Sequence, residues 1–223
     1  MDKKTGMKPT SVILLISALA STAAMPLLMP VPAHATQATT VAQAGAAPDL
    51  PYWQQTENRF EPERTCSLTS LAMVTDSLGL TSPDVNGRTP DYLFTKLGGV
   101  RQTVPALQSA FNSIAEAAGS QYRAHSKTDG TIAEVRQALN QGHPVIIHGW
   151  FTPSGHILVV TGFDGSHYTV HDPNGRWNLK KWGAYDTSVS GQGLRYPREA
   201  FERAINDNGS GDDLWLHIFR RAL

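Results

Sequence analysis

The sequence predicts an α+β fold, in which helices occupy the first half of the folded region and an antiparallel sheet occupies the second. Two observations carry this prediction. Between residues 66 and 142, apolar residues recur at helical spacing and the segments end at glycines. After residue 144, the apolar segments are short, rich in β-branched residues and separated by turn residues. Because the two kinds of segment are separated along the chain, they favour helices packed on an antiparallel sheet.

The helical segments have identifiable beginnings and ends. The segment that begins at Cys66 repeats apolar residues at intervals of three or four, and Gly79 supplies its end. Thr131 followed by Glu134 is a capping-box pattern, which begins another helix. The predicted helices cover residues 66–78, 90–97, 104–118, 131–142 and 197–206.

The strand segments follow in the second half. Asp164-Gly165 is a turn signal that joins two of them as a hairpin. The predicted strands cover residues 144–150, 157–163, 168–171 and 214–220. Residues 175–196 are rich in glycine and aromatic residues, and two interpretations stay open: a wall of a substrate cleft, or a surface loop packed by its own aromatics. The side chains in question are Arg176, Trp177, Lys180, Lys181, Trp182 and Tyr185.

The first 35 residues have the pattern of a secretory signal peptide. Three lysines precede an apolar run over 12–29, and Ala33-His34-Ala35 resembles a cleavage site. An uncleaved membrane anchor is the alternative. We therefore expect a signal peptide over 1–35, a flexible linker over 36–50 and one folded domain over 51–223. The expected location is secreted, periplasmic or otherwise in the cell envelope, with no stable membrane span after processing.

Charge and cysteine content exclude several classes of protein. The chain has 19 basic and 19 acidic residues, so it lacks the basic excess of a nucleic-acid-binding protein. Its single cysteine, Cys66, excludes an intramolecular disulfide and a cysteine-based zinc site. We expect a monomer without nucleic acid, cofactor or metal.

Cys66 lies in a pattern typical of nucleophilic catalysis. It begins a predicted helix, where the helix dipole and unpaired backbone N–H groups favour the thiolate. A thiolate needs a partner imidazole, and the imidazole needs an acceptor on its other nitrogen. His156 begins one strand and Asp172 ends the next, so the hairpin brings them together. The side-chain amide of Gln54 or Gln55, with the Cys66 N–H, would form an oxyanion hole.

These motifs, in this order, resemble the papain-like cysteine peptidases, and within them the family-39-like branch named for proteases that trim bacteriocin leader peptides. The matching pieces are Gln55, Cys66 at the start of its helix, Gly142-His143-Pro144-Val145, Ser154-Gly155-His156 and Asp172-Pro173-Asn174-Gly175. The resemblance implies a papain-like fold, with N-terminal helices that carry the nucleophile at a helix start, packed on a C-terminal antiparallel sheet. It also implies that Cys66 is the nucleophile, His156 the base, Asp172 the orienting residue and Gln55 the oxyanion donor.

The sequence departs from this family at Ser67, where glycine is common, and in the long interval between Gln55 and Cys66. We expect a secreted stand-alone form, without the leader-trimming role of members fused to transporters. The hypothesis is an exported cysteine hydrolase that cleaves peptide or amide bonds in peptides, proteins or peptidoglycan. An inactive peptide- or wall-binding module on the same fold and a metal-dependent hydrolase are the alternatives.

Other assignments of the site residues stay open. Asn174 is an alternative orienting residue, and His148 or His171 is an alternative base. Four residues offer ligands for the metal-dependent alternative: His148, His156, His171 and Asp172. A cysteine can also be a plain buried apolar residue.

Overall fold

The computed structural model describes residues 49–206 and 209–222. They all belong to one compact unit, Thr40–Leu223. The predicted signal peptide, and all but the last two residues of the predicted linker, lie outside the described residues.

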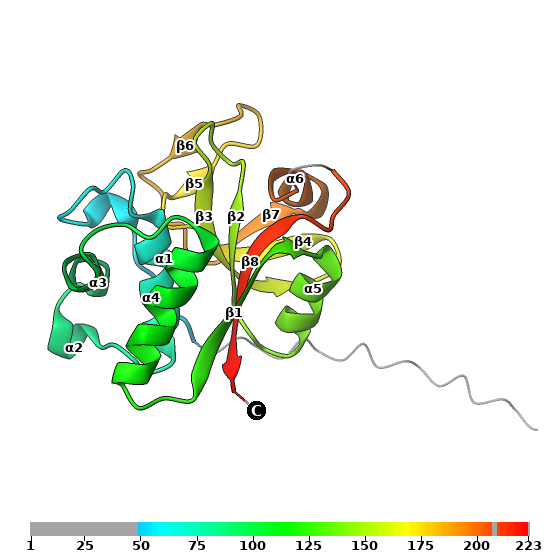
Figure 1. Cartoon of the computed structure of the whole chain (residues 1–223). Coiled ribbons are helices and arrows are strands. Elements are labelled where there is room, and N and C mark those ends of the chain that lie inside the picture. Colours follow the sequence, from blue (N-terminus) through cyan, green and yellow to red (C-terminus); the bar gives the residue numbers. More distant parts are fainter. Residues whose placement is uncertain (1–48, 207–208, 223) are drawn as a thin grey trace, which may run out of the picture. The chain divides into compact units, whose positions relative to one another are not determined.

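The main sheet in the described part of the chain has six strands in the order β1-β8-β2-β3-β4-β7 (Figure 1). Each neighbouring pair is antiparallel. Its strands are β1 (Tyr122–Gly130), β2 (Val145–Gly149), β3 (His156–Phe163), β4 (His167–His171), β7 (Leu194–Pro197) and β8 (Leu214–Arg221). A separate short hairpin pairs β5 (Arg176–Trp177) with β6 (Tyr185–Asp186).

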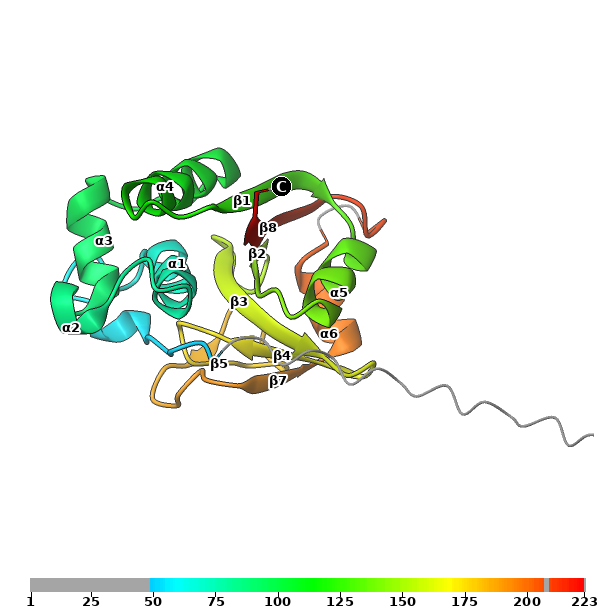
Figure 2. The same cartoon turned by 90° about the horizontal axis from the view of Figure 1, so that it is seen from below.

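Helices cover both faces of this sheet (Figure 2). On one side α1 packs on β3 and α4 packs on β1, with α3 against α1; on the other side α5 contacts β3 and α6 contacts β4. The helices are α1 (Cys66–Ser77), α2 (Pro83–Asn86), α3 (Thr89–Leu97), α4 (Val104–Ala117), α5 (Ile132–Asn140) and α6 (Arg198–Ala204), and a 3₁₀ turn, η1 (Gln55–Glu57), precedes α1.

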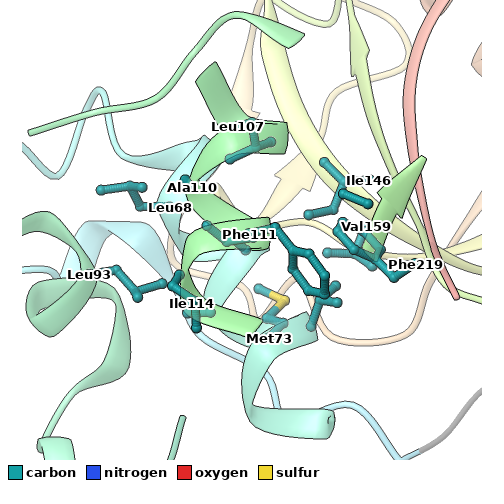
Figure 3. Packing of buried hydrophobic residues seen from close by; sticks show 14 of the residues in the cluster. Leu68, Met73, Leu93, Leu107, Ala110, Phe111, Ile114, Ile146, Val159 and Phe219 are labelled. Carbon is teal, nitrogen blue, oxygen red and sulfur yellow. The ribbon is translucent and has the colours of Figure 1, made fainter. Parts of the chain in front are cut away.

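The apolar core is divided by the sheet into two clusters. Between the sheet and the first helices, Met73 of α1 and Phe111 of α4 pack with Ile146 and Phe219 (Figure 3). The rings of Phe111 and Phe219 are 4.6 Å apart. The second cluster fills the space toward α5 and α6 and includes the fully buried Phe201. Apolar burial on both faces stabilises the central strands between two layers of helix.

The structure confirms the predicted α+β class and the positions of the predicted helices and main strands, within about two residues at most ends. Two strands of the main sheet were missed, β1 and β7, and so were the two short strands β5 and β6. β1 and β7 are the edge strands, which pair on one side only: β1 is mostly polar and β7 has only four residues, so neither has a strong apolar pattern. In β1 only Ala124 and Gly130 are buried, and pairing with β8 from Tyr122 onward forms the strand.

Candidate active site

Cys66 is the first residue of α1, and the helix holds it in the protein interior. The first ten residues of α1 are all buried, which fixes the helix axis against the sheet. At this position the Cys66 N–H has no acceptor within the helix. Cys66 retains 9% exposure and lines a pocket, so it is a mostly buried thiol that opens toward solvent.

Two neighbouring strands of the sheet bring His156 and Asp172 together. His156 begins β3, Asp172 follows the end of β4, and the two strands pair in an antiparallel register. Nε2 of His156 is 2.8 Å from Oδ1 of Asp172, and both side chains are buried. The Cys66 side chain also interacts with the His156 imidazole and contributes to raising the pKa of His156. Because Nε2 is used by Asp172, Nδ1 is the ring nitrogen left for the sulfur.

The electrostatics of the trio Cys66, His156 and Asp172 favour a protonated imidazole on His156. Burial by itself lowers the pKa of His156, but the charge and hydrogen bond of Asp172, with the contact to Cys66, outweigh it and raise that pKa to about 10. An imidazolium that persists beside sulfur stabilises a thiolate. The arrangement therefore places a positive charge beside the sulfur, as activation of a cysteine nucleophile requires.

The Asp172 carboxylate is fully buried and surrounded by donors. Oδ1 also accepts the backbone N–H of Asn174 at 3.0 Å. Oδ2 accepts the hydroxyls of Tyr185 at 3.1 Å and Tyr196 at 2.9 Å. Burial and then the charge of Asp172 raise the pKa of both tyrosines well above the ordinary value. Both phenols thus stay protonated and can donate.

The residues considered as an alternative orienting group or an alternative base make other contacts in the structure. The backbone of Asn174 bonds Asp172, and its side chain lines the pocket. His171 uses both ring nitrogens elsewhere: Nε2 donates to the carbonyl of Leu50 and Nδ1 accepts from the Gly193 N–H. His148 lies in the pocket wall, with its Nε2 3.0 Å from Nε2 of His217.

The His148–His217 pair is electrostatically the opposite of His156. Burial lowers the pKa of His148 to about 4. Burial and then the neighbouring His148 lower the pKa of His217 to about 3. The other ring nitrogen of His217, Nδ1, is hydrogen-bonded to Ser126 Oγ at 2.7 Å. Both rings are therefore neutral at neutral pH, and His148 forms an uncharged polar part of the pocket wall, with His217 buried behind it.

Of the two candidate glutamines, Gln55 faces the site. Its side chain is 3% exposed and lines the same pocket as Cys66. Nε2 donates to the carbonyl of Pro62 at 2.9 Å, and Oε1 has no hydrogen-bond partner among the described residues. Gln54 instead donates to the carbonyl of Thr187 at 2.6 Å, outside the pocket lining.

The long interval between Gln55 and Cys66 is held by a buried asparagine. Asn58 Nδ2 lies 2.9 Å from Thr65 Oγ1 and 2.8 Å from Thr69 Oγ1 at the start of α1. Arg88 donates to Asn58 Oδ1 at 3.0 Å and also to the carbonyl of Gln54. Ser67, the other departure from the family pattern, is fully buried, and its Oγ has no hydrogen-bond partner in the described part of the chain.

The pocket that contains Cys66, His156 and Gln55 has a volume of about 550 Å³. Two half-exposed tryptophans, Trp150 and Trp215, form part of its wall. None of the six side chains proposed from residues 175–196 lines this pocket. That segment therefore does not form the wall of the cleft; instead, Tyr185 and Tyr196 reach inward to Asp172.

Over residues 49–206 and 209–222, no group of three or more histidine, cysteine, aspartate or glutamate side chains is arranged to hold a metal ion. His148, His156, His171 and Asp172 accordingly do not converge on one point. Within the same residues, no helix has the length and apolar character needed to cross a bilayer.

A cysteine at a helix start, set against a histidine on an antiparallel sheet, defines the papain-like cysteine peptidase class. Residues 48–203 match the Peptidase_C39 like family, and the chain belongs to this family. This membership supports a cysteine-peptidase-like function.

Two solved structures are similar to this chain. A C39-like peptidase from Bacillus anthracis is 17% identical, with a TM-score of 0.50 over 80% of this chain and 98% of that chain. A double glycine motif protease from an AMS/PCAT transporter, in complex with the leader peptide, is 18% identical over 80% of this chain and 96% of that chain, with a TM-score of 0.46. A comparison with curated proteins gave no match.

Several residues of the site were not identified from the sequence. Tyr185 and Tyr196 carried no signal that separates a carboxylate donor from an aromatic core residue. Trp215 sits in an alternating strand, where its exposure at the pocket depends on the neighbouring loops. Asn58 had a weak signal, because a polar residue near a predicted helix start is often a cap.

Proposed function

We propose that the protein is an exported cysteine hydrolase that cleaves peptide or amide bonds, with Cys66 as nucleophile. The observation that carries the proposal is the setting of His156, which is hydrogen-bonded to Asp172, interacts with the Cys66 side chain and lines the same open pocket as Cys66. A merely structural cysteine needs neither a buried imidazole partner nor access to a pocket.

In this proposal the thiolate of Cys66 adds to the carbonyl carbon of the scissile bond. His156 donates its proton to the leaving amine, which departs and leaves a thioester on the sulfur. A water molecule then gives a proton to His156 and its oxygen to the acyl carbon. Release of the acid product restores the thiolate–imidazolium pair. Asp172 keeps the proton on Nε2 of His156, so that Nδ1 exchanges protons with substrate and water.

The oxyanion hole is formed by the Cys66 N–H and the side-chain amide of Gln55. The Cys66 N–H at the helix start has no intrahelical acceptor. An amide nitrogen carries two hydrogens, and the bond from Gln55 Nε2 to Pro62 uses one of them. The second is the donor assigned to the oxyanion.

The pocket wall supports a peptide substrate with a bulky apolar side chain next to the scissile bond. Trp150 and Trp215 supply half-exposed aromatic surface, and the neutral His148 adds no charge. Small peptides, exported proteins and the stem peptides of peptidoglycan all offer an amide of this kind. We propose that the protein acts on them as a monomer after export.

Export rests on the signal-peptide pattern of residues 1–35 and includes cleavage before Thr36. N-terminal sequencing of the exported product tests it, and an intact Met1 on membrane-bound material would contradict it.

The decisive experiment compares the processed protein with its Cys66→Ala variant on a peptide library and on purified peptidoglycan. We expect cleavage that the variant loses and that a chelator does not affect. Ser67→Ala is the matched control, because it changes the neighbouring buried side chain and should keep cleavage. Cleavage by Cys66→Ala, or loss of cleavage with chelator, would contradict the proposal. Binding of either material without any cleavage would favour an inactive binding module.

A further inference from the structure

Four donors surround the Asp172 carboxylate. His156 and the Asn174 N–H approach Oδ1, while Tyr185 and Tyr196 approach Oδ2. An ionised carboxylate has about four lone-pair sites, so this set fills it.

The direction of the Tyr196 hydrogen is fixed by its other partner. The backbone N–H of Trp177 donates to the Tyr196 hydroxyl oxygen at 3.0 Å. The phenol therefore accepts from Trp177 and donates to Asp172. The Tyr185 ring meets the His156 ring edge-on, with centroids 5.3 Å apart and planes at 65°. Tyr185 thus touches both members of the pair.

The backbone of Asp172 is held by the same segment of chain. Its N–H donates to the Gly191 carbonyl at 2.9 Å. The hydroxyl of Tyr52 donates to the Asp172 carbonyl at 3.0 Å and accepts the Gly191 N–H at 2.8 Å. Residues 175–196 consequently bond Asp172 through both its side chain and its main chain.

We propose that residues 175–196 are a positioning element for the active site, in which Tyr185 and Tyr196 hold the Asp172 carboxylate with Oδ1 toward His156. The χ2 torsion of aspartate is broad, so a carboxylate with nothing bonded to Oδ2 can turn away from the imidazole. With Oδ2 fixed, Nε2 of His156 keeps its acceptor and Nδ1 stays directed at Cys66. This inference rests on the proposed function, and both tyrosines act through Asp172 without contacting the sulfur.

The test uses Tyr185→Phe, Tyr196→Phe and the double variant, read out by the pH dependence of Cys66 alkylation with iodoacetamide. Tyr168→Phe is the matched control: Tyr168 is also buried and its hydroxyl also donates to a carboxylate, that of Glu202 at 2.7 Å, away from the site. Thermal melting of each variant separates lost stability from lost positioning. Alkylation needs no substrate, so it reports on the trio even if no peptide is cleaved.

Each Tyr→Phe variant in the site should slow alkylation at about pH 6 by roughly threefold to tenfold, the usual worth of one hydrogen bond. The pH of half-maximal alkylation should move upward, but by less than in His156→Ala, a variant that removes the imidazolium beside the sulfur altogether. Tyr168→Phe should lower the melting temperature and leave the alkylation profile in place. An unchanged profile, a downward move or an equal move in Tyr168→Phe would overturn the inference. If the variants show the expected shifts but the wild-type protein cleaves nothing, the proposed function alone is refuted.

Discussion

The backbone N–H of Gln55 donates to the carbonyl of Pro173 at 2.8 Å. This bond joins η1, which carries the proposed oxyanion donor, to the turn that directly follows Asp172. Two parts of the site that lie more than a hundred residues apart in the chain are therefore fixed to each other through their main chains. Because the bond to Pro173 uses the Gln55 backbone, it positions the Gln55 side chain without using the side-chain amide.

Gln55→Ala should lower kcat by about 10²-fold with little change in KM, because the amide matters only when charge develops on the oxygen. Gln54→Ala is the matched control, since Gln54 binds the Thr187 carbonyl outside the pocket. Steady-state kinetics on a peptide substrate measure both. Full activity in Gln55→Ala combined with a large loss in Gln54→Ala would move the oxyanion role to Gln54.

The folded protein should react quickly with iodoacetamide at about pH 6 and lose activity, because the imidazolium of His156 stabilises the thiolate of Cys66. His156→Ala should move the alkylation profile to higher pH. His171→Ala is the control, since its ring bonds Leu50 and Gly193. Mass spectrometry of the alkylated peptide gives the rate. A Cys66 that stays inert in folded, active protein would contradict the cysteine-hydrolase proposal.

What the sequence could predict depended on short-range physics. The capping box at Thr131 and Glu134 forms as predicted, because its two hydrogen bonds lie within one helical turn. The Asp164-Gly165 hairpin forms for the same reason, and its register brings His156 to Asp172. Local patterns thus located the trio in space.

The residues that hold the trio in place could not be predicted, because they contact Asp172 from positions far away in the sequence. Tyr52 bonds Asp172 across 120 positions, and Tyr196 does so across 24. A tyrosine has the same local pattern whether its hydroxyl meets a carboxylate or water. Edge strands such as β1 were missed similarly, since pairing with a distant strand, rather than apolar periodicity, forms them.

Gly191→Ala should disrupt the site through its direct contact with the Asp172 backbone. A Cβ at this position would overlap the Asp172 carbonyl oxygen, so the backbone would have to shift. We expect a loss of about 1–3 kcal/mol in the free energy of unfolding and slower alkylation of Cys66. Gly162→Ala is the control, because its nearest contact would be an ordinary 3.7 Å to Thr169. Urea unfolding measures the first effect, and a Gly191→Ala protein of full stability would contradict the close approach.

The free energy of unfolding should fall toward acid pH (the acid limb) and toward alkaline pH (the alkaline limb), and the two limbs have separate causes. The pKa of His148 is lowered from 6.5 to about 4, so below pH 6.5 the unfolded chain binds more protons, and stability falls as the pH drops toward 4. His217, lowered to about 3, extends this limb. The pKa of His156 is raised to about 10, so its contribution is complete below 6.5 and is lost as the pH rises toward 10.

His148→Gln and His156→Gln should therefore affect opposite limbs. His148→Gln removes one group that binds a proton on unfolding in acid. The free energy of unfolding should then fall less steeply below pH 6.5, by about 1.4 kcal/mol per pH unit, while its dependence on pH in the alkaline range is unchanged. His156→Gln should lower stability near neutral pH and flatten the alkaline limb while the acid limb stays. Urea unfolding across this pH range measures both variants, each serving as the control for the other. An acid limb that survives unchanged in His148→Gln would show that the His148–His217 pair is not its source.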